Sequence, residues 1–556
     1  MYPEYMTESI RKVERTRAKR FELAKKLGKE VYPPMSEKER EKILNTYHPD
    51  YKDDALRQIR IGPNKGEKIT NEVVEILESY PRNNPDEFDL NKVDYETDVL
   101  IVGAGSAGLA AAIEASNLGA RVMMVTKLRL GDSNSMMAQG GIQAADQSDD
   151  SPAVHYLDVI GGGHFDNKPD LVEALVKDAP QSIKWLEDLG VMFDKNEDGS
   201  MKVQSGGGTS RNRMHSARDY TGAAICRVLR DEVYNRPDKI KYLEYSAATE
   251  LILDDKGQAA GIILFHLELK EYFIVKAKAV IFATGGFGRL HIRGFETTNH
   301  YGATADGLVM GYRAGANLLY MDSVQYHPTG AVFPEQIVGF LCTEKIRGLG
   351  AQPVNKDGEL FVYPLEPRDI EASSFIRECQ TGRGVTTPSG LKGIWLDSPL
   401  IDMLKGSGTI ERYLPAMLRQ FNRFDIDIRK YPMLVYPTLH YQNGGLEIND
   451  KAETSIPGLY IAGEASGGVH GRNRLMGNSQ LDIVVFGRRA GKNAGERVKR
   501  GIKLGKLTLN HVEKYIKEVE KLGIDKTKIS PIILPDYIPS HVKAKQLTTT
   551  YQGTLV

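Results

Sequence analysis

Hydrophobic and polar residues change their spacing sharply near position 96. Residues 96–127 contain TDVLIVGAGSAGLAAAIEASNLGARVMMVTK, in which a short apolar run, glycines, an alanine-rich stretch and a second apolar run follow one another. Short apolar runs bounded by glycine are typical of buried strands, and an alanine-rich stretch is typical of a helix. The segment therefore predicts a strand, a glycine turn, a helix and a second strand. Two later runs, 280–288 and 457–468, predict further strands that lead into glycine turns.

The first 95 residues are polar and charge-rich, with 19 Lys and Arg against 19 Asp and Glu. Residues 7–28 and 71–80 have helical composition, and prolines at 33–34, 81 and 85 separate such stretches. Charge-rich helices generally face solvent, which favours a solvated extension. A docking arm for a partner subunit is the alternative. From about 489 onward the chain is basic and helical, and it ends in a proline-containing tail.

The overall composition narrows the possible classes of protein. A chain of 556 residues suffices for two or three domains of ~100–200 residues each. Lys plus Arg and Asp plus Glu both number 73, so no net field favours nucleic acid or an anionic membrane. No apolar run reaches the ~20 residues of a membrane helix, and the N-terminus lacks the apolar core of a secretory signal. We therefore expect a cytoplasmic protein with no nucleic-acid partner and no membrane insertion.

The three cysteines, Cys226, Cys342 and Cys379, are scattered along the chain. Their odd number and wide spacing argue against a disulfide framework. No Cys-x-x-Cys occurs, so we expect neither a metal site nor an iron–sulfur cluster in this chain.

Gly103, Gly105 and Gly108 form Gly-x-Gly-x-x-Gly between the first predicted strand and its helix. In a dinucleotide site the first glycine makes the turn, the second admits the pyrophosphate and the third lets the helix pack closely. The acid that usually binds the ribose ~20 residues later is missing, because the second strand ends in Thr126 and Lys127. Lys127 raises the possibility of NADP, yet the chain has one complete fingerprint only. We therefore predict FAD as the sole dinucleotide.

Five clusters of polar residues lie beside glycine or proline in predicted loops. A lone histidine or arginine is usually a core or surface residue, but five such clusters together supply at least three donors for two carboxylates. The clusters hold His327 (325–330), Thr343, Glu344 and Arg347 (342–348), Arg368 (366–376), His440 (436–445), and His470, Arg472, Arg474 and Ser479 (470–482).

These motifs occur in a familiar order. GAGSAGLAAA, AQGGI, ATGG, ADGLVMGYRAGA, QYHPTG, TEKIRG, PTLHY, GLYIAGE and NRLMGNSQLDIVVFGR span roughly 96–492. The chain resembles the flavoprotein subunits of succinate dehydrogenase and fumarate reductase, and the related L-aspartate oxidases share much of the pattern. The resemblance implies an α/β fold, with a Rossmann-type FAD-binding domain (96–325 and 437–492) and an inserted α+β capping domain (326–436). A charged helical N-terminal extension (1–95) and a short helical C-terminal segment (493–556) complete the expected organisation.

The resemblance also implies the roles of individual residues. His327, Thr343, His440 and Arg474 would bind the substrate carboxylates, Arg368 would deliver a proton, and Glu344 and Arg347 would relay that proton from solvent. FAD would be bound by Gly103, Ala104, Gly105, Ser106, Ala107, Gly108, Thr126, Lys127, Ser133, Asn134, Ser135, Ala138, Gln139, Gly140, Gly141, Thr284, Gly285, Asp306, Glu464, Ser479 and Gln480.

Simple chemistry agrees with these roles. Fumarate reduction needs a hydride on one face of the substrate and a proton on the other, in a geometry that carboxylate binding fixes. Arginine is a weak acid with a pKa above ~12, so it needs a nearby path that returns its proton. Glu344 and Arg347, at positions i and i+3, share one face of a helix and suit such a path.

Position 134 carries the clearest departure from the family. Counting back from AQGG, the histidine that respiratory members join covalently to the flavin is Asn134 here. Asparagine cannot form that bond, so the resemblance implies non-covalent FAD and favours fumarate reduction. The chain also has Leu349 where an acid is usual, Gln442 and Asn443 where Met-Gly-Gly is common, and no phenylalanine in 205–213. HYQNGG and Asn134 resemble the soluble, non-covalent branch that includes thiol:fumarate reductases.

A flavoprotein without cluster cysteines or a nicotinamide fingerprint needs an outside source of electrons. The resemblance implies an iron–sulfur partner subunit, of the type found with heterodisulfide reductases, which residues 1–95 would help to dock. Two alternatives stay open. The first is L-aspartate oxidase, and the second is a flavin electron-transfer subunit without substrate turnover.

Overall fold

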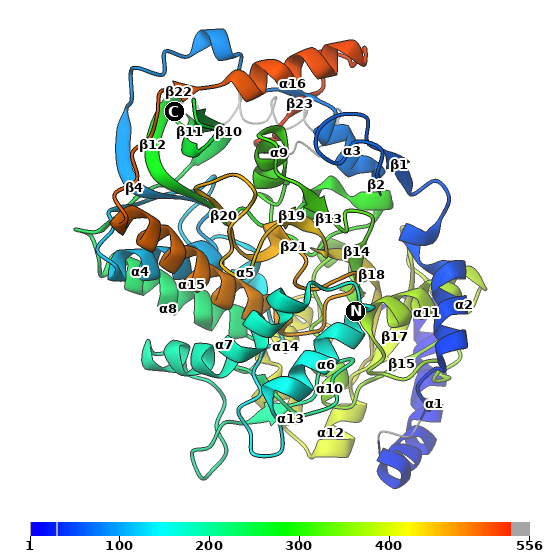
Figure 1. The fold of residues 1–556 in the computed structure, drawn as a ribbon. Coiled ribbons are helices and arrows are strands. Elements are labelled where there is room, and N and C mark those ends of the chain that lie inside the picture. Colours follow the sequence, from blue (N-terminus) through cyan, green and yellow to red (C-terminus); the bar gives the residue numbers. More distant parts are fainter. Residues whose placement is uncertain (1, 29–31, 535–556) are drawn as a thin grey trace, which may run out of the picture.

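The computed structural model describes residues 2–28 and 32–534. A twisted sheet of eight strands is its main sheet (Figure 1). The strand order is β22-β10-β11-β12-β4-β5-β9, with β20 beside β12. Strands β20, β12, β4, β5 and β9 run parallel, whereas β22, β10 and β11 are antiparallel to their neighbours. The bounds are β4 (Tyr95–Val102), β5 (Val122–Val125), β9 (Ile240–Leu243), β10 (Ser246–Asp254), β11 (Ala259–His266), β12 (Glu271–Phe282), β20 (Leu459–Ile461) and β22 (Leu507–Thr508).

The predicted strands at 96–127, 280–288 and 457–468 are therefore neighbours in one sheet. Helices α4 (Ser106–Asn117), α8 (Thr221–Tyr234) and α15 (Asn478–Lys499) lie together beside it (Figure 1). Glycines allow α15 to approach α4, because a Cβ atom at Gly491 would stand 2.2 Å from the Ala111 carbonyl oxygen. This close packing brings the start of α15 beside the glycine turn that opens α4.

A second, antiparallel sheet is formed by residues 324–442. Its order is β14-β18-β17-β15, and β16 pairs with β17. Helix α11 (Arg368–Gln380) packs on β14, β17 and β18. The strands are β14 (Val324–Ala331), β15 (Gln352–Val354), β16 (Val385–Thr386), β17 (Lys392–Asp397) and β18 (Met433–Gln442). An α+β unit is thus present where the sequence suggested a capping domain, and the exact boundaries at 326 and 436 stay a prediction.

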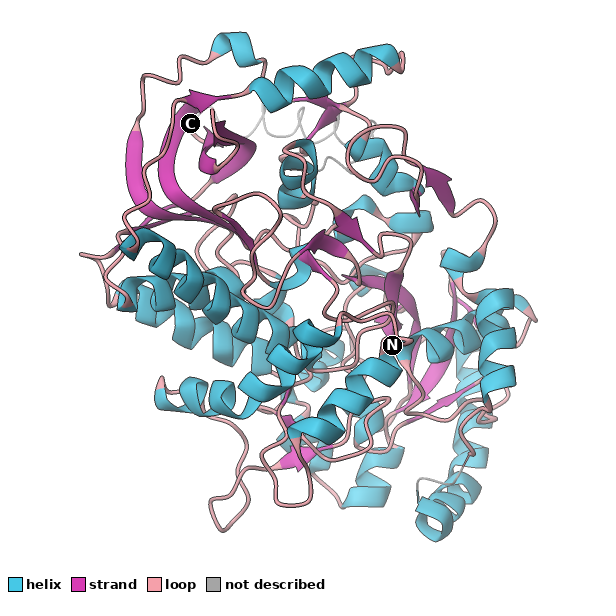
Figure 2. Cartoon of the chain, viewed as in Figure 1, coloured by secondary structure: helices cyan, strands magenta, loops and turns pink. Residues whose placement is uncertain are grey.

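Shorter elements connect these two sheets (Figure 2). Two three-stranded sheets, β13-β19-β21 and β6-β8-β7, are among them. The remaining bounds are α5 (Asn134–Met137), α6 (Pro152–Gly162), α7 (Pro169–Asp188), α9 (Asp306–Arg313), α10 (Lys345–Gly348), α12 (Leu400–Lys405), α13 (Thr409–Tyr413), α14 (Pro415–Asn422), β6 (Ile142–Gln143), β7 (Val203–Gln204), β8 (Met214–His215), β13 (Leu318–Leu319), β19 (Gly445–Glu447) and β21 (Ser466–Gly467).

The N-terminal segment packs against the rest of the chain. It contains three helices instead of the two expected, α1 (Glu4–Leu27), α2 (Glu37–Tyr47) and α3 (Asn71–Leu77), with a short β1-β2 pair (Leu56–Gln58, Lys68–Thr70) between the last two. Helix α1 begins three residues before the predicted start at Thr7. The inward face of α1 joins the core of the second sheet through Met6, Ile10 and Val13.

Ion pairs complete the attachment of α1. Arg17 and Arg20 both bind the buried carboxylate of Asp397, at 2.8 and 2.7 Å. A fully solvated extension is therefore wrong for α1, because its apolar positions and two arginines find partners within the same chain. Docking of a partner subunit by residues 1–95 stays a prediction.

The C-terminal segment packs against the main sheet and the N-terminal segment. After α15, β22 extends the main sheet, α16 (Asn510–Lys521) follows, and β23 (Ile529–Ser530) pairs in parallel with β3 (Tyr80–Pro81). Residues 493–534 thus contain the end of α15, β22, α16 and β23, and the short helical segment expected at 493–556 stays a prediction because 535–556 lie outside the described residues. Over the described ranges, every helix is too short or too polar to cross a membrane.

Candidate active site

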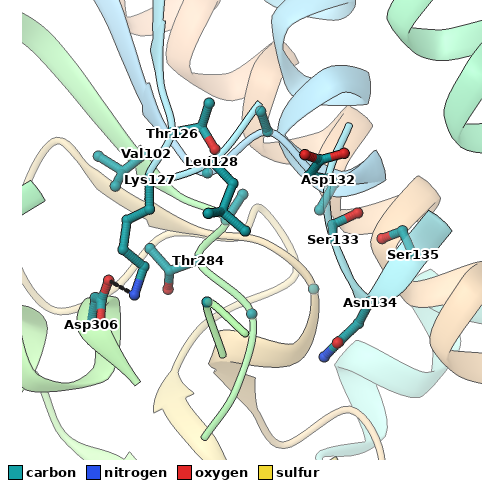
Figure 3. Close-up of a pocket in the computed structure, with 18 of the residues that line it drawn as sticks. Val102, Thr126, Lys127, Leu128, Asp132, Ser133, Asn134, Ser135, Thr284 and Asp306 are labelled. Carbon is teal, nitrogen blue, oxygen red and sulfur yellow. Dashed lines mark ion pairs between the residues drawn. The ribbon is translucent and has the colours of Figure 1, made fainter. Parts of the chain in front are cut away.

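A cavity lies at the carboxyl ends of β4 and β5 (Figure 3). Its floor is the predicted glycine turn. Gly103 has φ +104°, and a Cβ atom there would stand 2.2 Å from the Ala283 carbonyl oxygen, so only glycine fits. A Cβ atom at Gly108 would stand 2.0 Å from the Gly103 carbonyl oxygen, which explains why α4 starts so close to the turn.

The two walls of this cavity come from distant parts of the sequence. Lys127, after β5, forms an ion pair with Asp306 at 2.8 Å and donates to the Thr304 hydroxyl at 2.6 Å. Figure 3 shows this pair on one side and Ser133, Asn134 and Ser135 on the other. Because Lys127 already has a carboxylate partner, its charge does not favour the additional phosphate of NADP.

A second cavity continues the first toward the second sheet. Both cavities are lined by Asn134, Ser135, Glu464 and Ile483, and the second also reaches His440. The site is therefore long, with a glycine turn and a helix N-terminus at one end and a histidine at the other.

FAD fits this arrangement. Its pyrophosphate would lie on the glycine turn, where the start of α4 favours negative charge. Two buried polar atoms that line the site lack a hydrogen-bond partner within the described structure, Thr284 Oγ1 and Gln480 Oε1. Such groups are costly to bury alone, and a polar cofactor would satisfy them.

Asn134 stands where the two cavities join. Its Oδ1 accepts from the His300 backbone N–H at 2.8 Å, and its Nδ2 donates to Asn299 Oδ1 at 2.5 Å. Nδ2 also lies 3.4 Å from the Glu464 carboxylate, whose pKa burial raises to about 7. Asn134 thus connects the 131–142 segment to residues 299–300 and to Glu464.

Beyond the second cavity, two buried arginines converge on one oxygen. Oε1 of Gln325, on β14, accepts from Arg368 Nη1 at 2.9 Å and from Arg474 Nη2 at 2.8 Å. Burial and the charge of Arg368 lower the pKa of Arg474 to about 9. The Arg474 guanidinium also lies 4.5 Å from the centre of the Tyr441 ring, which holds its plane. Gln325 Nε2 fixes the amide by donating to the Arg474 carbonyl at 2.7 Å.

Two histidines complete this end of the site. His327 on β14 and His440 on the adjacent strand β18 have ring centres 4.9 Å apart. Burial, together with the nearby Arg368, lowers the pKa of both rings well below the usual value, so both are neutral at pH 7. The Thr298 hydroxyl is 2.7 Å from His440 Nδ1 and fixes that ring.

Thr343 and Glu344 precede the short helix α10. Glu344 binds Arg368 Nε at 2.8 Å and Arg347 Nη2 at 3.4 Å, and it accepts from the Gly207 backbone N–H at 2.7 Å. Although burial raises the pKa of Glu344, the two arginines bring it below the usual value. Thr343 is buried, and its Oγ1 would be 4.0 Å from a Cβ atom at Gly140. The expected contact between Glu344 and Arg347 is therefore present, and Glu344 also contacts Arg368.

Three comparisons identify the family. A family model described as an FAD binding domain matches residues 98–480. The chain is 38% identical over 438 residues to a fumarate reductase (CoM/CoB) subunit of Methanothermobacter marburgensis, covering 77% of this chain and 76% of that protein. It is 37% identical over 408 residues to an L-aspartate oxidase of Nostoc, with coverage of 72% and 68%. Among solved structures, Escherichia coli quinol fumarate reductase FrdA superposes with a TM-score of 0.69 at 32% identity, covering 77% and 74% of the two chains.

The chain belongs to the FAD-binding family of succinate dehydrogenase and fumarate reductase flavoprotein subunits. It is an FAD-dependent oxidoreductase of α/β fold, and the family resemblance stated from its motifs is confirmed. Relatives in this family are subunits of multi-subunit complexes.

Most of the residues predicted for this family's cofactor do line the joined cavities. The residues in contact with this space are Gly103, Ala104, Gly105, Ala107, Thr126, Lys127, Ser133, Asn134, Ser135, Ala138, Thr284, Gly285, Asp306, Glu464, Ser479 and Gln480. Ser106, Gly108, Gln139, Gly140 and Gly141 do not line either of these two cavities. Gly108 and Gly141 act through packing, since a Cβ atom at Gly141 would stand 2.6 Å from the His215 carbonyl oxygen.

The sequence analysis missed two residues of the site. Gln325 is two positions before His327 in a strand, and alternate residues of a strand face the same side. Glu371, which accepts a hydrogen bond from Arg347, lies three positions after Arg368 in a helix and therefore on the same face. Both spacings are visible in the sequence. Each identifies a site residue only when the type of element and the position of its partner residue are known.

Proposed function

We propose that this chain is the catalytic flavoprotein subunit of a fumarate reductase, with Arg368 as the proton donor. The observation that carries this proposal is the convergence of Arg368 and Arg474 on Gln325. These arginines lie beside the second cavity, because Arg474 packs on Tyr441, which lines it. Two buried guanidinium groups with fixed planes suit the two carboxylates of a small dicarboxylate. The neutral rings of His327 and His440 add hydrogen-bond donors without adding charge.

The geometry suits the chemistry of fumarate reduction. FAD, when bound and reduced by the electron donor, would supply a hydride to one face of the double bond. The chain holds the carboxylates, excludes water and stabilises the charge that builds on one carboxylate. Arg368 gives a proton to the second carbon, and Glu344, at 2.8 Å, is placed to return it. Arg347 Nη2 lies 3.4 Å from the same Glu344 oxygen that binds Arg368, and it extends the relay.

We infer that FAD is bound without a covalent link. Asn134 offers no nucleophile, and its three polar contacts are to protein groups. In the family resemblance, a covalent histidine raises the flavin potential and suits succinate oxidation. Its replacement favours fumarate reduction as the working direction.

We also infer a separate source of electrons. No group of three or more His, Cys, Asp or Glu side chains in the described ranges is arranged to hold a metal ion, and the three cysteines are buried and apart. An iron–sulfur subunit, of the type found with heterodisulfide reductases, fits this need, and a cytoplasmic location fits such a partner. Because α1 is held by its own chain, a partner would contact its outward face.

Direct assays test the proposal. The purified chain loaded with FAD should reduce fumarate with reduced viologen, and should oxidise succinate more slowly with a dye. Arg368→Ala should keep FAD and the fumarate-induced change in the flavin spectrum but lose turnover, whereas Arg377→Ala, on the same helix, should behave as wild type. Near-normal turnover by Arg368→Ala would defeat the assignment.

The Nostoc relative makes L-aspartate oxidase the second candidate, since both families share the site motifs. Peroxide formation from L-aspartate, without fumarate reduction by viologen, would decide for it.

A further inference from the structure

A second buried carboxyl group lies beyond Arg347. Arg347 Nη1 donates hydrogen bonds to Glu371 Oε2 and to the Pro364 carbonyl oxygen, the latter at 2.8 Å. The side chains of Arg347 and Glu371 have no exposed surface. The relay in the proposed function ends at Arg347 and gives no role to Glu371.

A third carboxyl group leads from this region to the surface. Glu366 is buried, lies on the loop that contains Pro364, and acts electrostatically on Glu371. Its Oε2 binds Arg40 Nη2 of α2 at 2.7 Å, and its Oε1 accepts from the Met35 backbone N–H at 2.6 Å. The Arg40 side chain is 36% exposed.

The outer end of this series opens to solvent. Glu366 and Arg40 both line a solvent-open cavity of about 1710 Å³ between α2, α6 and the 205–209 loop. The inner end is packed tightly, because a Cβ atom at Gly207 would stand 2.7 Å from Glu344 Oε1 and 3.3 Å from the Glu366 carbonyl oxygen. Glu366 therefore lines the cavity and also acts electrostatically on Glu371, which contacts Arg347.

We propose that Glu371 and Glu366 extend the proton relay from Arg347 to this cavity, and that Arg40 of the N-terminal segment holds its outer end. The inference rests on the proposed function of Arg368. Each relay group gives one proton inward and receives one from its outer neighbour. One proton thus enters from solvent for each proton given to the product, and the relay returns to its starting state.

The electrostatics of Glu371 support a proton-holding role. Burial raises the pKa of Glu371 well above its usual value, and the attraction of Arg347 does not offset this effect. The other charged groups that act on it are Glu344, Glu366 and Arg368. A carboxyl group kept protonated beside a guanidinium can release a proton when Glu344 needs one.

A competing route begins at Arg347 itself. Arg347 also borders a cavity between the end of α1 and residues 403–405. Its side chain has no exposed surface there, so a direct exchange with solvent would need the surrounding structure to open. The two routes differ in their dependence on Arg40.

Kinetics test the relay. Glu371→Gln and Glu366→Gln should each lower kcat with reduced viologen by at least about tenfold. The loss should grow as the pH rises, because solvent protons become scarce. The solvent deuterium isotope effect on kcat should increase, while the fumarate-induced flavin change keeps its midpoint. Glu371→Asp should restore part of the rate.

A matched control separates the relay from general damage to α11. Glu378 lies on the same helix, is buried, and forms ion pairs with Arg377 and Arg383 at 3.2 and 2.8 Å. Glu378→Gln should leave the pH profile and the isotope effect unchanged. Wild-type profiles in both Glu371→Gln and Glu366→Gln would overturn the proposal.

The N-terminal contribution has its own pair of variants. Arg40→Ala should reproduce the pH-dependent loss of kcat, and Lys38→Ala, an exposed residue of α2, should not. If Arg40→Ala and Glu366→Gln had no effect while Glu371→Gln did, protons would enter at Arg347 and the proposed route would be wrong.

An infrared measurement is independent of turnover. The wild-type protein at neutral pH should show a protonated carboxyl band that is lost in Glu371→Gln and kept in Glu378→Gln. Absence of that difference would overturn the role of Glu371. A wild-type protein that does not reduce fumarate would defeat the proposed function instead, and the infrared result would still decide the protonation of Glu371.

Discussion

Replacement of Gln325 by methionine removes the one side-chain oxygen that holds both substrate arginines. Methionine has a similar length and is apolar, so the change keeps the volume of the side chain while it removes the acceptor. Arg368 and Arg474 would each lose a buried hydrogen bond of 2.8–2.9 Å. The Arg474 carbonyl would lose its donor as well.

The structure sets the size of the effect. A hydrogen bond to a charged group contributes about 1.5–3 kcal/mol, so two such bonds amount to about 3–6 kcal/mol. Since each 1.4 kcal/mol corresponds to about a factor of ten, the kcat/KM for fumarate should fall by roughly 10²–10⁴. Most of the loss should be in kcat, because a guanidinium that is not aligned cannot deliver its proton.

Steady-state fumarate reduction with reduced viologen measures this effect, with FAD content determined in the same samples. Gln352→Met is the matched control, because Gln352 is also buried and accepts from Arg20 Nη1 at 3.2 Å, in the second sheet. That variant should lose stability but keep kcat/KM. A Gln325→Met enzyme with full FAD content and kcat/KM within about threefold of wild type would refute the role given to Gln325.

Three further predictions address the cofactor and the N-terminal segment. Acid precipitation should leave the yellow colour in the supernatant because Asn134 cannot bind the flavin covalently, and colour in the pellet would contradict this. Gly103→Ala should abolish FAD binding, measured by absorbance of the purified protein, since its Cβ atom would lie 2.2 Å from the Ala283 carbonyl oxygen. Asp50, buried between the Val324 N–H and the Tyr326 hydroxyl, has its pKa raised to about 7 by burial. Its stabilising contribution, up to about 4 kcal/mol, should be complete below about pH 4 and lost as the pH rises through 7. Thermal unfolding should show this decline in wild type and not in Asp50→Asn.

The sequence alone determined the strands and the glycine turn of the main sheet, and most of the residues that line the joined cavities. The apolar runs and glycines of 96–127 are local signals, because a turn with positive φ at Gly103 and a buried strand before it are decided by a few neighbouring residues. The order of motifs then identified the family. The i, i+3 spacing of Glu344 and Arg347 also predicted a contact that the structure contains.

Only the tertiary structure decided how distant segments meet. The apolar face of α1 looked solvated because charges surround it in the sequence, yet the second sheet provides Asp397 and an apolar surface that no local pattern specifies. Gln325 became part of the site because β14, α11 and the loop before α15 converge there. Glu371 and Glu366 became neighbours of the relay for the same reason. The sequence shows which residue types can form ion pairs and hydrogen bonds. Which of them meet depends on how distant segments pack together.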